Sequence, residues 1–262
     1  GESHRIGLWR RLWLALMESE RELGLDIPAA AVAELAAHLD DIDLQAAASY
    51  ESRFRHDVMA HIRTYGDQCP QARGIIHLGA TSAFVGDNTD LIQMREGLHL
   101  IRTRLVNTMQ ALAQFAARQR AVVTLGYTHF QPAQLTTVGK RATLWAQDFG
   151  LDIEELSRRL PTLRARSAKG TTGTQASFLE LFGGDHGKVR ELERQVTRRL
   201  GFAESFPVTG QTYPRKLDAQ ALDVLSGIAQ SASKMAADLR LLQHEGELLE
   251  PIDEAADGSG LG

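Results

Sequence analysis

Short segments rich in His, Thr, Ser, Gln and Gly interrupt the long helical stretches of this sequence. They are residues 55–57, 77–82, 126–134, 169–175 and 209–213. A histidine can transfer a proton near neutral pH. Hydroxyls, side-chain amides and backbone N–H groups exposed at glycines bind carboxylates and phosphates. These segments therefore indicate proton transfer and anion binding on loops that a rigid scaffold holds in place.

Taken one at a time, the same segments also fit ordinary structural roles. Thr-Ser and Gly-Thr-Thr-Gly are common in turns and helix caps. A lone histidine is more often a surface or hydrogen-bonded residue than a catalyst, so His61 and His77 stay open. No role is assigned to His4, His38, His99, His186 and His244.

Several other kinds of site are excluded by spacing. Gly139-Lys140 is followed by Arg141, where the phosphate-binding loop of nucleotide hydrolases needs Ser or Thr. His56 and His61 are five positions apart, a spacing that does not place both on one helix face, and no His-Glu-x-x-His occurs. We expect no metal site. The single cysteine cannot form an internal disulfide, which fits a reducing, cytoplasmic setting.

The composition is that of an ordinary globular chain. The 262 residues are 43% hydrophobic and 24% charged, enough for one large domain or two small ones. The 29 basic and 33 acidic residues give a net charge of −4, which argues against a general nucleic-acid-binding protein. No apolar run is long enough for a membrane span, and the first residues lack the layout of a signal peptide.

Three long segments carry apolar residues three or four positions apart. Residues 87–122, 135–160 and 221–242 each place these side chains on one helix face. Asp87 or Asn88 is the expected N-cap of the first helix, and Pro161 is expected to end the second. Three such rods predict a helical bundle with shallow crossing angles, whereas no alternating run favours a sheet.

Shorter helices are predicted upstream, over residues 8–23, 28–39 and 44–65. The predicted fold class is therefore all-α. We expect a small N-terminal helical domain over residues 1–80 and a long-helix bundle over residues 81–253. The bundle is expected to be incomplete at its C-terminal end, with residues 254–262 as a flexible tail.

Four strings together resemble the adenylosuccinate lyase family, within the fumarase/aspartase superfamily of long-helix bundles. They are RHDVMAH at 55–61, HLGATSAFVGDN at 77–88, GYTHFQPAQLTTVGKR at 126–141 and KGTTGTQASFL at 169–179. The resemblance extends from about Trp9 to Pro251. It implies a carbon–nitrogen lyase that eliminates fumarate from adenylosuccinate, giving AMP, and from the succinyl-carboxamide ribotide of purine biosynthesis. It implies no cofactor.

The resemblance also implies a role for individual residues. His129 matches the general acid that protonates the leaving nitrogen, and Thr128 beside it would contact the substrate. Arg55, His56 and Asp57 match the nucleotide-binding Arg-His-Asp motif. The other matching positions, which would bind the succinyl part and supply a substrate-binding amide, are Thr81, Ser82 and Gln211. Residues 169–175 match a signature loop that would support the pocket.

The last residues depart from the family pattern. Counting without a gap from Glu250-Pro251 places Ser259 on the family's general base, but Gly260 replaces the second serine of that loop. The Met-Pro-x-Lys segment that should follow is absent. Three interpretations remain: part of an active adenylosuccinate lyase, which we favour; another lyase of the superfamily; or a truncated, inactive relative acting as a binding or assembly module. The Arg-His-Asp and Thr-Gly-Gln-Thr-Tyr motifs argue against argininosuccinate lyase and fumarase.

The resemblance finally implies partners. Members of the family are homotetramers whose active sites take loops from three subunits. We therefore expect a cytoplasmic homotetramer with shared active sites that binds a small nucleotide substrate. Neither nucleic acid nor a membrane is an expected partner.

Overall fold

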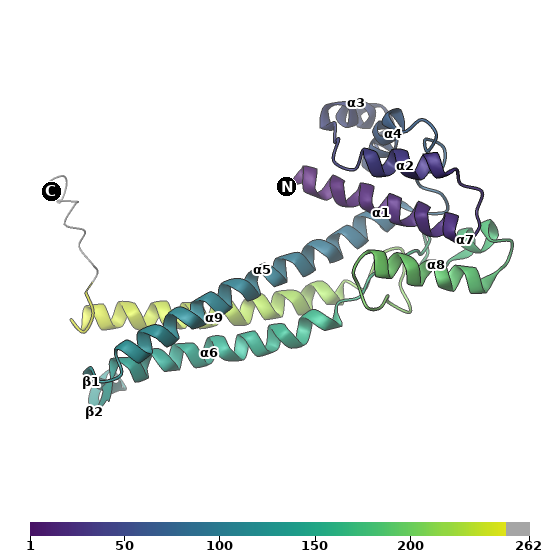
Figure 1. Ribbon diagram of the computed structural model, residues 1–262. Coiled ribbons are helices and arrows are strands. Elements are labelled where there is room, and N and C mark those ends of the chain that lie inside the picture. Colours follow the sequence, from purple (N-terminus) through teal and green to yellow (C-terminus); the bar gives the residue numbers. More distant parts are fainter. Residues whose placement is uncertain (250–262) are drawn as a thin grey trace. The chain divides into compact units, whose positions relative to one another are not determined.

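The computed structural model describes residues 1–249, and its regular elements are almost all helical (Figure 1). The predicted all-α fold class is confirmed. The helices are α1 (Glu2–Glu22), α2 (Ala29–Ala37), α3 (Leu44–Phe54), α4 (Asp57–Gln68), α5 (Ser82–Arg118), α6 (Val138–Arg159), α7 (Ala176–Leu181), α8 (His186–Arg199) and α9 (Lys216–His244). The strands are β1 (Val123–Thr128) and β2 (Gln131–Thr137), and a 3-10 turn, η1 (Leu160–Thr162), follows α6. Ser259 and the predicted tail lie outside the described residues.

The chain divides into two compact units, and each is described by itself. Unit 1 comprises Gly1–Gly97 and Thr162–Leu217, and unit 2 comprises Leu98–Pro161 and the described residues from Asp218 onward. Helix α5 runs through both units, because it begins in unit 1 and ends in unit 2. The domain boundaries expected at residues 80 and 253 stay predictions.

In unit 1, helix α1 provides the central packing surface. It packs against α2 and α8, while α3 packs against α4. Trp9 and Trp13 of α1 are almost fully buried, with ring centroids 6.2 Å apart in an edge-to-face arrangement. Tyr65 of α4 lies 6.2 Å from Trp13, centroid to centroid. Large aromatic side chains of this kind contribute much of the burial energy of a small helical core.

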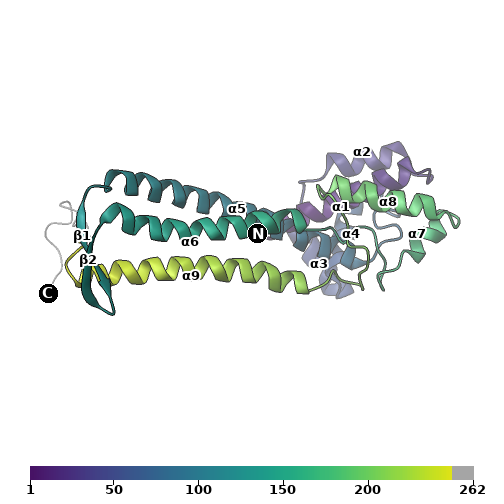
Figure 2. The ribbon, with the colours of Figure 1, turned by 90° about the horizontal axis from the view of Figure 1, so that it is seen from below.

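In unit 2, three long helices lie side by side, as both ribbon views show (Figures 1 and 2). Helices α6 and α9 are joined by the Trp145 Nε1 hydrogen, which is donated to Asp238 Oδ2 at 2.9 Å. Lys234 of α9 pairs with Asp148 of α6 at 3.1 Å. The predicted long-helix bundle is confirmed. No helix within residues 1–249 is long and apolar enough to cross a membrane.

The expectation that the chain lacks strands is wrong at one place, the antiparallel hairpin β1–β2 between α5 and α6. Thr128 pairs with Gln131, so the turn contains only His129 and Phe130. Both have positive φ, 53° and 57°, which a tight hairpin of the right twist requires. The turn could not be predicted from the sequence, because two-residue hairpin turns usually have Asn or Gly at the positions that His129 and Phe130 occupy.

Two helix boundaries also differ from the prediction. The helix expected over residues 44–65 is broken, because Arg55 adopts a left-handed conformation (φ 50°) and His56 caps α4 by accepting from the Met59 N–H at 3.3 Å. Helix α5 begins at Ser82, so neither Asp87 nor Asn88 is its N-cap. Both corrections place predicted site residues at helix ends.

Candidate functional site

The first segment of the candidate site lies at the α3–α4 break, and its His56 acts electrostatically on a second histidine, His77. His77 accepts a hydrogen bond at Nδ1 from Trp13 Nε1 at 2.9 Å, so its Nε2 is left to carry the ring hydrogen. Burial, together with a smaller contribution from the charge of His56, lowers the pKa of His77 to about 4. His77 is therefore a neutral donor near His56. Sequence reasoning left its role open because only its surroundings decide it.

The loop that contains His77 continues to the start of helix α5. Thr81 is buried, its carbonyl accepts the Phe84 N–H at 2.8 Å, and Ser82 is the first helical residue. The backbone N–H groups at the start of a long helix attract carboxylates and phosphates. This location supports the expectation that Thr81 and Ser82 contact an acidic part of a ligand.

Gly79 packs this loop against helix α7. It has a φ of +67°, and a Cβ there would meet Phe178 at 2.9 Å and Leu181 at 2.8 Å. Its carbonyl accepts the Ser177 hydroxyl hydrogen at 2.7 Å. Because α7 follows directly on residues 169–175, the loops 77–82 and 169–175 lie beside each other in unit 1.

Loop 169–175 also touches the segment that carries Gln211. Gly173 has a φ of +80°, and a Cβ there would collide with the Thr209 carbonyl and approach the Gly210 oxygen at 2.7 Å. The two backbones are thus in direct contact, which only glycine permits. This contact brings Gln211, an exposed residue, next to the signature loop.

Helix α5 binds the backbone of the Gln211 segment and of the residues just before loop 169–175. Asp87 Oδ2 accepts the Tyr213 N–H at 2.6 Å, and Asn88 Oδ1 accepts the Ser167 N–H at 2.9 Å. Burial raises the pKa of Asp87, although the Tyr213 N–H and the Arg215 charge oppose that rise. From the sequence, Asp87 or Asn88 is expected only to cap the helix. The available signal was that they are two adjacent polar residues followed by a helical apolar pattern.

A buried ion pair lies beneath the signature loop. Lys169, with 4% of its side chain exposed, pairs with Glu193 of α8. Glu193 also accepts from Gln175 Nε2 at 3.2 Å and from the Ser205 hydroxyl at 2.7 Å. This network ties both ends of the loop to one helix. It supports the expected role of residues 169–175 as a support of the pocket.

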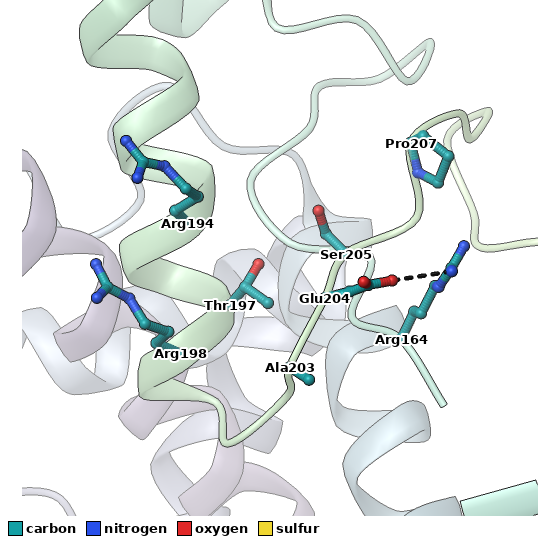
Figure 3. A pocket seen from close by; sticks show the side chains of 8 residues that line it. All are labelled: Arg164, Arg194, Thr197, Arg198, Ala203, Glu204, Ser205 and Pro207. Carbon is teal, nitrogen blue, oxygen red and sulfur yellow. Dashed lines mark ion pairs between the residues drawn. The ribbon is translucent and has the colours of Figure 1, made fainter. Parts of the chain in front are cut away.

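The outer side of this network borders an open hollow of about 590 Å³ (Figure 3). Thr197 and Ser205 line it, and Arg164 pairs there with Glu204 at 2.9 Å. The other lining residues are Arg194, Arg198, Ala203 and Pro207. None of the sequence-predicted site residues lines this hollow, so it is distinct from the loops that carry them.

Thr128 and His129 lie in unit 2, at the end of the β1–β2 hairpin, and both are exposed. The base of the hairpin is fixed by Arg141, whose Nη2 donates to the Leu125 carbonyl at 2.7 Å and whose Nη1 lies 3.7 Å from Glu247. Arg141 therefore has a structural role in the described chain. The hairpin turn thus exposes the imidazole of His129, whose backbone has a left-handed conformation.

Six of the predicted residues lie in one compact unit, and two lie in the other. The loops of unit 1 carry Arg55, His56, Asp57, Thr81, Ser82 and Gln211. The hairpin of unit 2 carries Thr128 and His129, and Ser259 lies outside the described residues. Within residues 1–249, no group of three or more His, Cys, Asp or Glu side chains is placed to hold a metal ion.

Comparison with known proteins gives the chain its family. It matches the sequence profile of the lyase family over residues 24–261. It is 49% identical to the adenylosuccinate lyase of Saccharomyces cerevisiae over 259 residues, which are 98% of this chain and 54% of that protein. It is 50% identical to the adenylosuccinate lyase of Schizosaccharomyces pombe over 258 residues, 97% of this chain and 54% of that protein. The chain therefore spans about half the length of these relatives.

A solved structure of another protein has a similar fold. The fumarate lyase from Mesorhizobium sp. BNC1 is similar with a TM-score of 0.81 at 23% identity, over 93% of this chain and 56% of that one. The predicted bundle type and the resemblance to adenylosuccinate lyases are both confirmed. With its profile match over most of its residues, this chain belongs to the lyase family.

Proposed function

We propose that the natural protein carrying these residues is an adenylosuccinate lyase. It cleaves adenylosuccinate to AMP and fumarate, and it cleaves the succinyl-carboxamide ribotide of purine biosynthesis in the same way. The observation that carries the proposal is the 49–50% identity to two yeast adenylosuccinate lyases over nearly the whole chain. The presence of the predicted nucleotide and succinyl segments in one compact unit supports it.

The reaction requires a base, an acid and a way to hold charge. A base removes a proton from the carbon beside a carboxylate, and the electron pair left behind forms the double bond of fumarate. The C–N bond breaks, and its electrons go to the nitrogen of the nucleotide. His129 donates a proton to that nitrogen, and Ser259 is the proposed base. Thr128 contacts the substrate next to His129.

Binding is the proposed task of unit 1. Arg55 and His56 contribute positive charge and hydrogen-bond donors for the phosphate, with Asp57 beside them. Thr81 and Ser82 hold the succinyl carboxylates at the N-terminus of α5. The exposed amide of Gln211 binds the substrate from the neighbouring loop.

Assembly completes the proposal. Six of the seven predicted binding residues lie in unit 1, whereas Thr128 and the predicted acid, His129, lie in unit 2. Members of the family share their sites among subunits. We infer a cytoplasmic homotetramer with active sites shared among its subunits. The exposed apolar side chains of the long helices support this assembly.

The test is turnover by the natural protein at the length its gene encodes. Adenylosuccinate is added, the absorbance change is followed, and AMP and fumarate are measured by chromatography. The proposal predicts equal amounts of both products. Binding of adenylosuccinate without release of fumarate would reject the lyase assignment and favour a binding module instead.

A further inference from the structure

Arg166 is a completely buried side chain that is surrounded by backbone carbonyls of unit 1. Its Nη1 donates to the Lys169 carbonyl at 2.8 Å, and its Nη2 donates to the Gly170 carbonyl at 2.9 Å. Its Nε donates to the Gln211 carbonyl at 2.7 Å. A weaker bond reaches the Ser167 carbonyl at 3.3 Å. One guanidinium therefore joins two loops that are distant in sequence.

The chemistry of this position requires arginine. Burial lowers the pKa of Arg166 to about 10, and the nearby charge of Asp87 opposes that shift. The group thus keeps its charge at neutral pH. A guanidinium presents five donors in a rigid plane, whereas a lysine ammonium has three donors at one point and cannot reach all these carbonyls at once.

The segment that Arg166 holds is fixed on both sides of Gln211. The Tyr213 N–H is bonded to Asp87, and the backbone of Thr209 and Gly210 lies against Gly173. In the part of the chain that the structure describes, the Gln211 side-chain amide has no hydrogen-bond partner and is exposed. The backbone is immobilised while the amide remains available to a ligand.

We propose that Arg166 is a positioning residue, which holds the Gln211 carbonyl and the loop at residues 167–170 in one arrangement. That arrangement presents the Gln211 amide to the nucleotide substrate. Arg166 itself does not touch the ligand, because four protein carbonyls occupy its donors. The identity of the ligand rests on the proposed function, but the coupling of the two loops does not.

The first test measures loop order without any ligand. Hydrogen exchange is compared between the unaltered protein, Arg166→Lys and the control Arg194→Lys, whose side chain is 70% exposed. We expect amides in residues 167–175 and 207–215 to exchange at least about tenfold faster in Arg166→Lys and at unchanged rates in the control. Unchanged exchange in both loops of Arg166→Lys overturns the proposal.

A measurement on the unaltered protein covers the case in which Arg166→Lys does not fold. The Nε–H hydrogen of Arg166 is followed by NMR and compared with that of exposed Arg194. Protection of the Arg166 hydrogen by at least about tenfold supports its bond to Gln211. Exchange at the rate of Arg194 overturns the proposal.

The second test asks whether Arg166 acts through Gln211, which a merely structural role would not do. The dissociation constant for adenylosuccinate is measured for Arg166→Lys, Gln211→Ala and the double variant. We expect Arg166→Lys to weaken binding about tenfold alone and less than twofold in the Gln211→Ala background. Leu16→Ala, a core variant of α1, controls for lost stability and should leave binding unchanged.

The outcomes separate this inference from the proposed function. An equal loss of binding in both backgrounds overturns the action of Arg166 through Gln211. If the unaltered protein does not bind adenylosuccinate at all, the proposed function fails. The exchange experiments then still decide whether Arg166 couples the two loops.

Discussion

His129 lies on a backbone that few side chains adopt. It shares a two-residue hairpin turn with Phe130, and both have positive φ. Strain of this kind persists where the surrounding structure imposes it and is frequent at functional sites. The exposed imidazole is accessible to a substrate.

We expect His129→Ala to lower kcat of the natural protein by about 100-fold or more, because a general acid contributes roughly 10²–10⁴-fold. KM should change less than about threefold, since the acid acts mainly in the transition state. Steady-state kinetics with adenylosuccinate measure both. His99→Ala, an exposed histidine of α5, is the control. A kcat near that of the control would remove His129 from the role of acid.

The protonation state of Glu20 is determined by the burial of its carboxyl group. Glu20 is completely buried in α1, and within the described residues neither carboxyl oxygen has a hydrogen-bond partner. Burial raises the pKa of Glu20 from 4.5 to about 9. The folded protein thus retains a proton that the unfolded chain releases above pH 4.5. The free energy of unfolding should therefore fall as pH rises from about 4.5 toward 9.

Glu20→Gln removes this titration while keeping the shape of the side chain. We expect it to raise the free energy of unfolding by about 1–3 kcal/mol at pH 8 and by little at pH 4.5, at about 1.4 kcal/mol per pKa unit. Urea unfolding at both pH values measures the effect. Glu2→Gln, exposed on the same helix, should show no such difference. An equal change at both pH values would mean that Glu20 is not protonated in the fold.

At the scale of elements, loop 169–175 lies in close contact with the segment at residues 209–213 in unit 1. Gly173→Ala would force a Cβ into the Thr209 carbonyl, whereas Gly183→Ala would meet nothing within 4 Å, although Gly183 also has positive φ, +59°. Both variants lose about 1 kcal/mol from the left-handed backbone. Only Gly173→Ala should also weaken adenylosuccinate binding, by about tenfold or more, in a fluorescence titration. Equal binding by both variants would show that the contact does not shape the site.

The elements that the sequence could predict are those with a repeating pattern. Apolar spacing located α5, α6 and α9 because a bundle buries one continuous face of each helix. It did not find the hairpin, whose turn has His129 and Phe130 in place of residues that favour positive φ. Nor did it find the break at Arg55, since that residue also lacks the signature of a helix end.

The candidate site was predictable where a residue type carries its own chemistry. His129 and the Thr81-Ser82 pair are candidates of this kind, and their roles stay predictions that the family resemblance implies. Asp87, Asn88 and Arg166 act through backbone groups of distant loops, so no local pattern could distinguish them from ordinary surface or cap residues. Their roles follow only from the folded arrangement.

At the scale of the whole molecule, the long helices expose apolar side chains. Leu100 of α5, Leu151 of α6 and Leu222 of α9 are each about 60% exposed, at 58%, 58% and 63%. Apolar groups at such positions on three helices of one unit are typical of an interface between subunits. They fit the proposed assembly through the bundle.

We expect sedimentation velocity to show self-association of the natural protein at micromolar concentration. Leu151→Asp combined with Leu222→Asp should shift it toward the monomer, because charges on these faces must be desolvated in an interface. Ala30→Asp, at an exposed position of α2, should sediment like the parent. A compact monomer in the unaltered protein would contradict the shared-site arrangement.

The proposed nucleotide site is tested most directly by isothermal titration calorimetry, in which adenylosuccinate is titrated into the 262-residue protein. We predict saturable binding that Gln211→Ala weakens by about tenfold or more, because we propose that the loops of unit 1 form the nucleotide-binding part of the site. Absence of saturable binding, or binding that Gln211→Ala leaves unchanged, would contradict it.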